Sequence, residues 1–104
     1  MPLIRVHNST GADLDVVRVH VPAEPREAVD FGAVPEGAYS EYRRVTVAYR
    51  FVEVEASGAA ESFSLRPYDY VGEQPLPEGR HTYRLAVDQG RFTLDLEETL
   101  PEGQ

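Results

Sequence analysis

The sequence contains no cysteine and no lysine among its 104 residues. The absence of cysteine excludes disulfides, thiolate zinc sites, iron–sulfur clusters and cysteine nucleophiles. All 10 basic residues are therefore arginines, against 18 Asp and Glu, and the formal net charge is -8. A nucleic-acid-binding protein normally carries a basic stripe that neutralises phosphates, but only Arg43 and Arg44 are adjacent basic residues here. We therefore predict no nucleic-acid partner.

Isoleucine and asparagine are almost absent too, with Ile4 and Asn8 the single examples. A GC-rich genome explains this bias together with the absence of lysine. An acidic, lysine-free surface also suits high salt, in which excess carboxylates keep the surface hydrated. No apolar run approaches the ~18–20 residues of a membrane span, and the amino terminus lacks the apolar region of a signal peptide. We expect no membrane span in this chain, and either a cytosolic protein or an exported one whose leader has been removed.

What the sequence does contain is enough apolar residues for a core and a repeating strand pattern. Leu, Ile, Val and Phe total 26 residues, which predicts one folded domain over residues 1–104. Runs rich in Val, Tyr, Phe and Thr alternate with a two-residue period between clusters of turn residues. The sequence therefore predicts an all-β fold: a single β-sandwich of about seven to eight mostly antiparallel strands, immunoglobulin-like or prealbumin-like. Prolines that mark edge strands favour a sandwich over a closed barrel.

The first two strands are expected at residues 3–8 and 14–21. Turn chemistry at residues 9–12 predicts that they form a hairpin. The adjacent Val16 and Val17 break the alternation of the second strand, which predicts a bulge there or burial on both faces.

The middle of the chain is punctuated by proline. Three prolines between residues 22 and 35 restrict residues 28–32 to a short edge strand at most, because proline donates no ladder hydrogen bond. Residues 40–56 change phase near Phe51, which predicts a bulge or a passage from one sheet to the other. A turn at residues 57–60 then leads into a strand at 61–66.

The carboxyl end is the clearest hairpin in the sequence. Its turn is expected at residues 88–90. The inward-facing positions are expected to be Tyr83, Leu85 and Val87 before the turn, and Phe92, Leu94 and Leu96 after it.

The stretch Leu76–Leu85, which reads LPEGRHTYRL, resembles a late strand entry of immunoglobulin-like, fibronectin-III-like and transthyretin-like sandwich modules. In those modules a glycine turns the chain into the strand and a tyrosine closes a corner, a role that the resemblance implies for Tyr83. A wider pattern resembles small domains of bacterial exported or lipid-anchored proteins that carry no known activity. It runs through Phe31-Gly32, Ser40-Glu41-Tyr42, Ala48-Tyr49-Arg50 and Asp69-Tyr70-Val71-Gly72 to the final hairpin. This resemblance implies an exported, periplasmic or cell-envelope location.

Catalytic motifs are missing from the sequence. Nucleophilic catalysis typically places a serine in a G-x-S-x-G elbow, whereas Ser57 lies in what we interpret as a hairpin turn. His7, His20 and His81 lie on separate strand segments, so we expect each to face solvent rather than to converge on a metal. We therefore predict no enzyme, and no catalytic, cofactor or metal site. Carboxylates assembled across strands are the one catalytic arrangement that a single sequence leaves open.

Carboxylates are the most numerous polar groups. Glu53 and Glu55 are two apart on one strand, which places them on the same face roughly 7 Å apart; we interpret that face as solvated. Asp69 and Glu73 flank an irregular loop that could bind a cation through backbone carbonyls, although an Asp that caps its own turn is the more usual arrangement. The sequence has no D-x-D-x-D-G calcium loop.

Tyrosine and arginine provide the functional signal. Both residue types are frequent in protein interfaces, and tyrosines in saccharide-stacking surfaces, but tyrosine also suits half-buried strand positions. Asn8-Ser9-Thr10 matches the glycosylation pattern, and we interpret it as a turn. The predicted interaction surface consists of Tyr42, Arg43, Arg50, Tyr68, Asp69 and Tyr70.

These observations favour a non-catalytic binding or assembly module without a cofactor. Its expected partner is a protein, either another chain or a second copy that forms a homo-oligomer. The alternative is an accessory domain that binds a small ligand, a saccharide or Ca²⁺.

Overall fold

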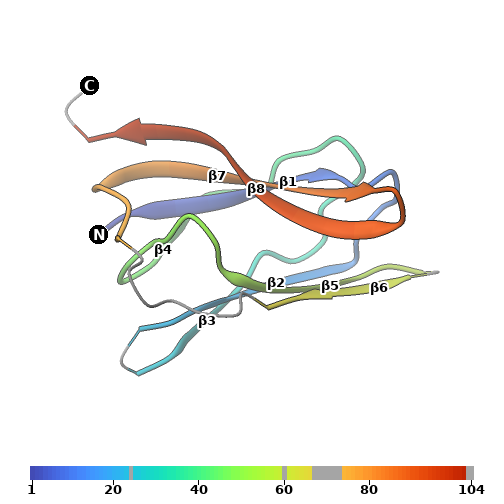
Figure 1. The fold of residues 1–104 in the computed structure, drawn as a ribbon, viewed down its shortest axis with the longest axis horizontal. Coiled ribbons are helices and arrows are strands. Elements are labelled where there is room, and N and C mark those ends of the chain that lie inside the picture. The colour runs from blue at the N-terminus through green and yellow to red at the C-terminus, as the bar shows by residue number, and fades with distance from the viewer. Residues whose placement is uncertain (24, 60, 67–73, 103–104) are drawn as a thin grey trace.

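The structure of the protein is a computed structural model that describes residues 1–23, 25–59, 61–66 and 74–102. Its strands are β1 (Leu3–Ser9), β2 (Val16–Val21), β3 (Glu27–Asp30), β4 (Arg43–Arg44), β5 (Glu53–Ser57), β6 (Ser62–Leu65), β7 (Gly79–Asp88) and β8 (Arg91–Pro101). They form two four-stranded sheets, in the orders β4-β1-β7-β8 and β3-β2-β5-β6. We call these the upper and the lower sheet, after their places in Figure 1. The predicted all-β sandwich is confirmed.

The core lies between the two layers. Alternation along each strand turns one set of side chains inward, as in β1, where Ile4 and Val6 are fully buried while Arg5 and His7 lie on the outer face. Burial of such side chains stabilises the fold by about 1.5–3 kcal/mol each. No helix long and apolar enough to cross a membrane occurs among the described residues.

The predicted hairpin between the first two strands is wrong. β1 pairs in parallel with β7, from Leu3 opposite Arg80 to Ser9 opposite Ala86, whereas β2 belongs to the lower sheet. The turn residues after Ser9 carry the chain from one layer to the other. Local turn chemistry could not distinguish these outcomes, because both need the same residue types and differ only in the distant strand that each segment pairs with.

The expectation for Val16 and Val17 is also wrong. β2 pairs with β5 in an unbroken register through both valines, opposite Ser57 and Ala56. Val17 is fully buried, and Val16 is 46% exposed on the outer face. The second strand therefore alternates regularly, with an apolar residue in one outward position.

Of the two outcomes that the sequence predicted near Phe51, a bulge or a strand that passes between the sheets, the chain does pass between the sheets, but through a segment outside the strands. β4 lies in the upper sheet and β5 in the lower sheet, so residues 45–52 carry the chain across. Val45, Ala48 and Val52 are buried along the way. The short β3 is an edge strand, again as predicted.

The carboxyl-terminal hairpin is confirmed as well. β7 and β8 are joined by Gln89 and Gly90, whose φ angles of 51° and 79° are of the sign that a type I′ turn requires. Phe92 stacks on Phe63 of β6 at 4.8 Å between ring centroids, which joins the edges of the two sheets. Val87 corrects the prediction: it is exposed, because it lies beside the turn at the end of the hairpin.

Candidate functional site

The outer face of the upper sheet carries a cluster of tyrosine, arginine, histidine and glutamate. Its base is β1, where Arg5 and His7 are half-buried and point away from the core. Beside β1 runs the segment that precedes β4. Its Ser40 donates a backbone hydrogen bond to Val6 at 2.8 Å, and Tyr39 pairs with His7 in an isolated bridge.

The register between this segment and β1 contains one extra residue. Tyr39 lies opposite His7 and Arg43 lies opposite Ile4, so four steps along one strand match three along the other. Such irregularities change the direction in which side chains point. Tyr42 contacts the same arginine as Tyr39 as a result.

The aromatic rings and the arginine side chains of this cluster form a continuous series of contacts. The His7 ring stacks on Tyr39, with centroids 4.1 Å apart and planes 9° from parallel. The guanidinium carbon of Arg5 lies 4.3 Å from the Tyr39 centroid and 4.7 Å from the Tyr42 centroid. Arg80 approaches the Tyr42 ring at 6.0 Å. Cations at these distances are attracted to an aromatic face by about 0.5–1 kcal/mol at exposed sites.

A bulge in β8 supplies the acidic member. Tyr83 pairs with Leu96 but Thr82 pairs with Glu98, which leaves Glu97 as an extra residue. Its carboxylate lies 2.7 Å from Nδ1 of His7 and accepts a hydrogen bond of 3.0 Å from the Tyr39 hydroxyl. We call Arg5, His7, Tyr39, Tyr42 and Glu97 the Tyr–Arg cluster.

The cluster perturbs the acidity of two of its members. Burial raises the pKa of Glu97, but the hydrogen bonds with His7 and Tyr39 outweigh it and lower the pKa overall. The hydrogen bond to Glu97 raises the pKa of the Tyr39 hydroxyl, and burial adds to this effect. At neutral pH Glu97 is therefore an ionised acceptor and Tyr39 a neutral donor.

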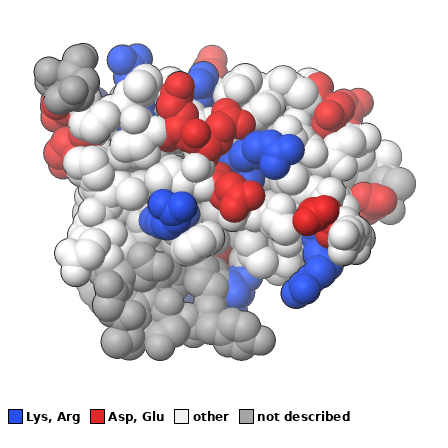
Figure 2. All heavy atoms as spheres, turned by 45° about the horizontal axis from the view of Figure 1, so that its top comes forward, with Lys and Arg blue, Asp and Glu red and all other residues white. Residues whose placement is uncertain are grey.

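The remaining polar contacts fix Arg5 in place. Its Nε donates to the Thr82 hydroxyl at 2.9 Å, and a terminal nitrogen lies 3.7 Å from Glu98. With the upper sheet turned forward, Figure 2 shows acidic and arginine side chains interspersed. The arrangement offers aromatic surface, donors and acceptors in one fixed patch, which suits recognition of another molecule.

The predicted surface residues fall in different places. Tyr42 belongs to the cluster. Arg43 lies on β4 and forms an ion pair with Glu41 at 3.3 Å, and Arg50 is exposed in the segment that passes between the sheets. Tyr68, Asp69 and Tyr70 lie outside the described residues, as does Glu73.

The sequence reasoning missed Arg5, His7 and Glu97 as site residues. Alternation along a strand places Arg5 and His7 on one face, but it does not show which face of the sandwich holds the tyrosines. No sequence pattern around Glu97 marks it as a site residue, because only the bulge in β8 directs its side chain toward His7.

The predicted solvent exposure of the histidines is wrong for His81 and overstated for the other two. His81 is fully buried; its Nε2 lies 2.8 Å from the Pro77 carbonyl and its Nδ1 lies 3.2 Å from the Thr99 hydroxyl. A carbonyl can only accept, so Nε2 carries the proton. His7 and His20 each contact a glutamate and are half-buried.

The comparisons with known proteins give no relative. No family model matches the chain, and no curated protein or solved structure matches it significantly.

Proposed function

We propose that this chain is a non-catalytic binding or assembly module that engages a protein surface through the Tyr–Arg cluster. The main support for this proposal is the contact of Arg5 with the rings of both Tyr39 and Tyr42. The Tyr39 side chain remains 46% exposed in this arrangement. Tyrosine and arginine are enriched where protein interfaces concentrate their binding energy. Tyrosine also supplies a large, rigid contact area at a low cost in conformational entropy.

The fixed geometry of the cluster favours binding. Ordering a flexible side chain at an interface costs about 0.5–1.5 kcal/mol. Arg5 is already held by Thr82, and Tyr39 is already held by Glu97. A partner that docks here would meet side chains whose freedom was lost on folding, so more of the contact energy remains for affinity.

We further propose a cell-envelope location. Its support is the resemblance of the chain to domains of bacterial exported or lipid-anchored proteins. A second copy of the chain is the partner that can be tested directly.

The test measures molecular mass by sedimentation equilibrium over a wide range of protein concentrations. We expect the mass of the wild type to rise with concentration, and the Tyr42→Ala variant to remain a monomer at concentrations where the wild type associates. Phe51→Ala is the control, because it also removes an aromatic ring from the surface but lies outside the cluster. A Tyr42→Ala variant that associates like the wild type would refute the proposed surface.

The alternative function is recognition of a small ligand. Exposed tyrosine beside charged side chains is also the composition of saccharide-binding surfaces, and carboxylates bind Ca²⁺. Thermal melts with Ca²⁺, EDTA, NaCl and a saccharide panel separate the two, because a ligand that binds the native state raises the melting temperature. A shift with one ligand that Tyr42→Ala abolishes, together with a mass independent of concentration, would favour this alternative.

A further inference from the structure

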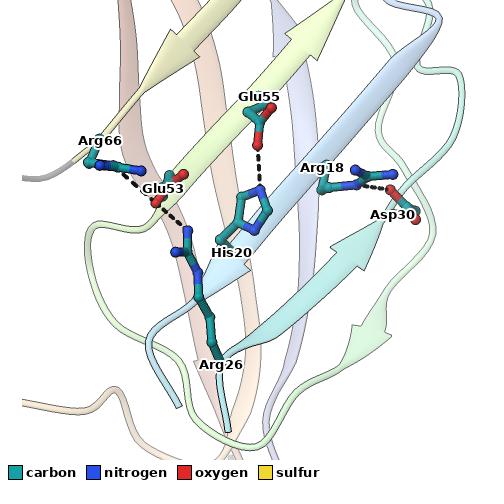
Figure 3. Close-up of polar contacts among 7 residues, drawn as sticks. All are labelled: Arg18, His20, Arg26, Asp30, Glu53, Glu55 and Arg66. Atoms are coloured by element: carbon teal, nitrogen blue, oxygen red, sulfur yellow. Dashed lines mark hydrogen bonds and ion pairs between the residues drawn. The ribbon is translucent and has the colours of Figure 1, made fainter. Parts of the chain in front are cut away.

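A second cluster lies on the outer face of the lower sheet, on β2 and β5. His20 lies opposite Glu53 in the register between these strands, and Glu55 is two residues further along β5. The inner positions on either side are valines and an alanine, so the three polar side chains share the outer face. Figure 3 shows the His20 ring directed at Glu55, with Glu53 beside it.

The ligand atoms of this cluster are close enough to share one ion. One atom from each of His20, Glu53 and Glu55 lies within 4.8 Å of the other two, and Nε2 of His20 lies 2.5 Å from the Glu55 carboxylate. Zinc binds nitrogen and oxygen ligands at about 2.0–2.2 Å in tetrahedral geometry, which sets neighbouring ligand atoms about 3.3–3.6 Å apart. The imidazole and the Glu55 carboxylate need to separate by about 1 Å to bind the same ion.

We propose that His20, Glu53 and Glu55 form a binding site for a divalent transition-metal ion, with Zn²⁺ as the reference ion. Imidazole nitrogen combined with carboxylate oxygen suits zinc, whereas Ca²⁺ takes oxygen ligands alone. Three protein ligands leave a fourth position for water or for a group of a partner. Both His20 and Glu53 are half-buried, with side chains 16% and 15% exposed, so neither loses much mobility when it binds the ion.

Two arginines form ion pairs with the Glu53 carboxylate, which the metal ion would bind. Arg26 lies 2.5 Å and Arg66 lies 3.4 Å from the same oxygen of Glu53. Their side chains are more than half exposed, and ion pairs of this kind contribute about 0–1 kcal/mol. A divalent ion would replace the positive charge that the two guanidinium groups now place beside the Glu53 carboxylate. The arginines therefore compete with the metal and set its affinity.

The site is independent of the Tyr–Arg cluster, because the two lie on opposite outer faces of the sandwich. The lower sheet also carries an ion pair of 2.7 Å between Arg18 and Asp30. Neither residue supplies a ligand atom to the group of three, but Arg18 lies opposite Glu55 in the register and its charge interacts with that carboxylate.

The experiment titrates the protein with ZnCl2, and separately with CaCl2, in isothermal calorimetry. We expect saturable binding of one Zn²⁺ per chain and no comparable heat with Ca²⁺. His20→Gln and Glu55→Gln each remove one ligand and should weaken zinc binding about tenfold or more. All three side chains lie on the outer face of the lower sheet and outside the core, and unchanged circular dichroism would show that the variants remain folded.

His7→Gln is the matched control. His7 also lies beside a glutamate, at 2.7 Å, and is 17% exposed, but among the described residues it belongs to no group of three ligands. This variant should bind zinc like the wild type. Equal loss of binding in His7→Gln and His20→Gln, or no saturable binding in the wild type, would overturn the proposal.

A gain in affinity provides a second test. The double variant Arg26→Gln and Arg66→Gln removes both competitors and should bind zinc several-fold more tightly than the wild type. Ordinary surface adsorption to carboxylates would not respond to His20→Gln in this background, whereas the proposed site would lose its binding there. Weaker binding in the double variant would contradict the competition.

Discussion

The hydroxyl of Tyr83 donates a hydrogen bond to the backbone carbonyl of Tyr49. Tyr83 is fully buried on β7 of the upper sheet, and Tyr49 lies in the segment that crosses between the sheets. The bond therefore joins the centre of one layer to the connection between both. It also provides a hydrogen-bond donor for the Tyr49 carbonyl, which lies outside the strands of both sheets.

We predict that Tyr83→Phe lowers the free energy of unfolding by about 1–2 kcal/mol. The ring and its packing remain, so the loss comes from the hydroxyl and from the Tyr49 carbonyl that it serves. Urea denaturation followed by circular dichroism measures the effect. Tyr42→Phe is the control, because Tyr42 lies at the surface and its hydroxyl deletion should stay within about 0.5 kcal/mol of the wild type. Equal stability of the wild type and Tyr83→Phe would show that the bond contributes nothing net.

A second prediction concerns Asn8, which is fully buried at the end of β1. Its amide nitrogen donates to the carbonyls of Ala12 and Val34, at 2.8 Å each, and its oxygen accepts from Thr10. Asn8→Ala leaves the Val34 carbonyl without this donor and should lower the free energy of unfolding by about 1–3 kcal/mol. A thermal melt measures the loss. Ser9→Ala, in the next and partly exposed position, should change stability much less.

The interpretation of Asn8-Ser9-Thr10 as a turn is wrong for its first two residues, which pair with β7 as the end of β1; the chain leaves the strand at Thr10, which donates to the Asn8 side-chain oxygen. Periodicity indicated which residues face inward, because a strand alternates whatever it pairs with. The Gln89-Gly90 turn could be predicted for the same reason, because its residues are adjacent in the sequence. The partner of β1 could not be predicted, because its parallel neighbour β7 is more than seventy residues away. No pattern within either strand encodes that choice.

The candidate site shows the same limit. Tyr42 was predicted from its residue type, because tyrosine and arginine are enriched where protein interfaces concentrate their binding energy. Its actual neighbour Arg5 comes from a strand that only the sheet register brings close. Glu53 and Glu55 were correctly placed on one face, but the approach of His20 depends on the pairing of β2 with β5, which the incorrect first hairpin had hidden.

A third prediction tests the start of β7. Gly79 has a φ of 144°, and a Cβ there would lie 2.2 Å from the Leu100 carbonyl oxygen and 2.8 Å from the Pro101 Cα. Gly79→Ala should therefore destabilise the protein by more than about 3 kcal/mol, because both strain and a backbone clash oppose it. Gly90→Ala is the control: its φ is also positive, but a Cβ meets nothing within 4 Å. That variant should lose only about 1–2 kcal/mol in urea denaturation.

The fourth prediction concerns the pH dependence of the Tyr–Arg cluster. The pKa of Glu97 is lowered in the folded protein: burial alone would raise it, but the contacts with His7 and Tyr39 outweigh burial. NMR titration of the Glu97 carboxyl carbon should give a midpoint below the ordinary value of about 4.3. His7→Gln should raise this midpoint, and His20→Gln, on the opposite sheet, should leave it unchanged. A wild-type midpoint at or above the ordinary value would contradict the assigned contacts.

The sign of the resulting pH effect follows from linkage. A carboxylate whose pKa is lower in the folded state stabilises the fold fully above its unfolded pKa, and this contribution is lost as the pH falls through the folded pKa. The Glu97→Gln variant lacks this carboxylate and therefore lacks its pH-dependent contribution to stability. The wild type should therefore be more stable than Glu97→Gln at neutral pH, and the difference should shrink as the pH is lowered below about 4. Urea denaturation of both proteins at several pH values measures the difference, and one that grew on acidification would reverse the assigned sign.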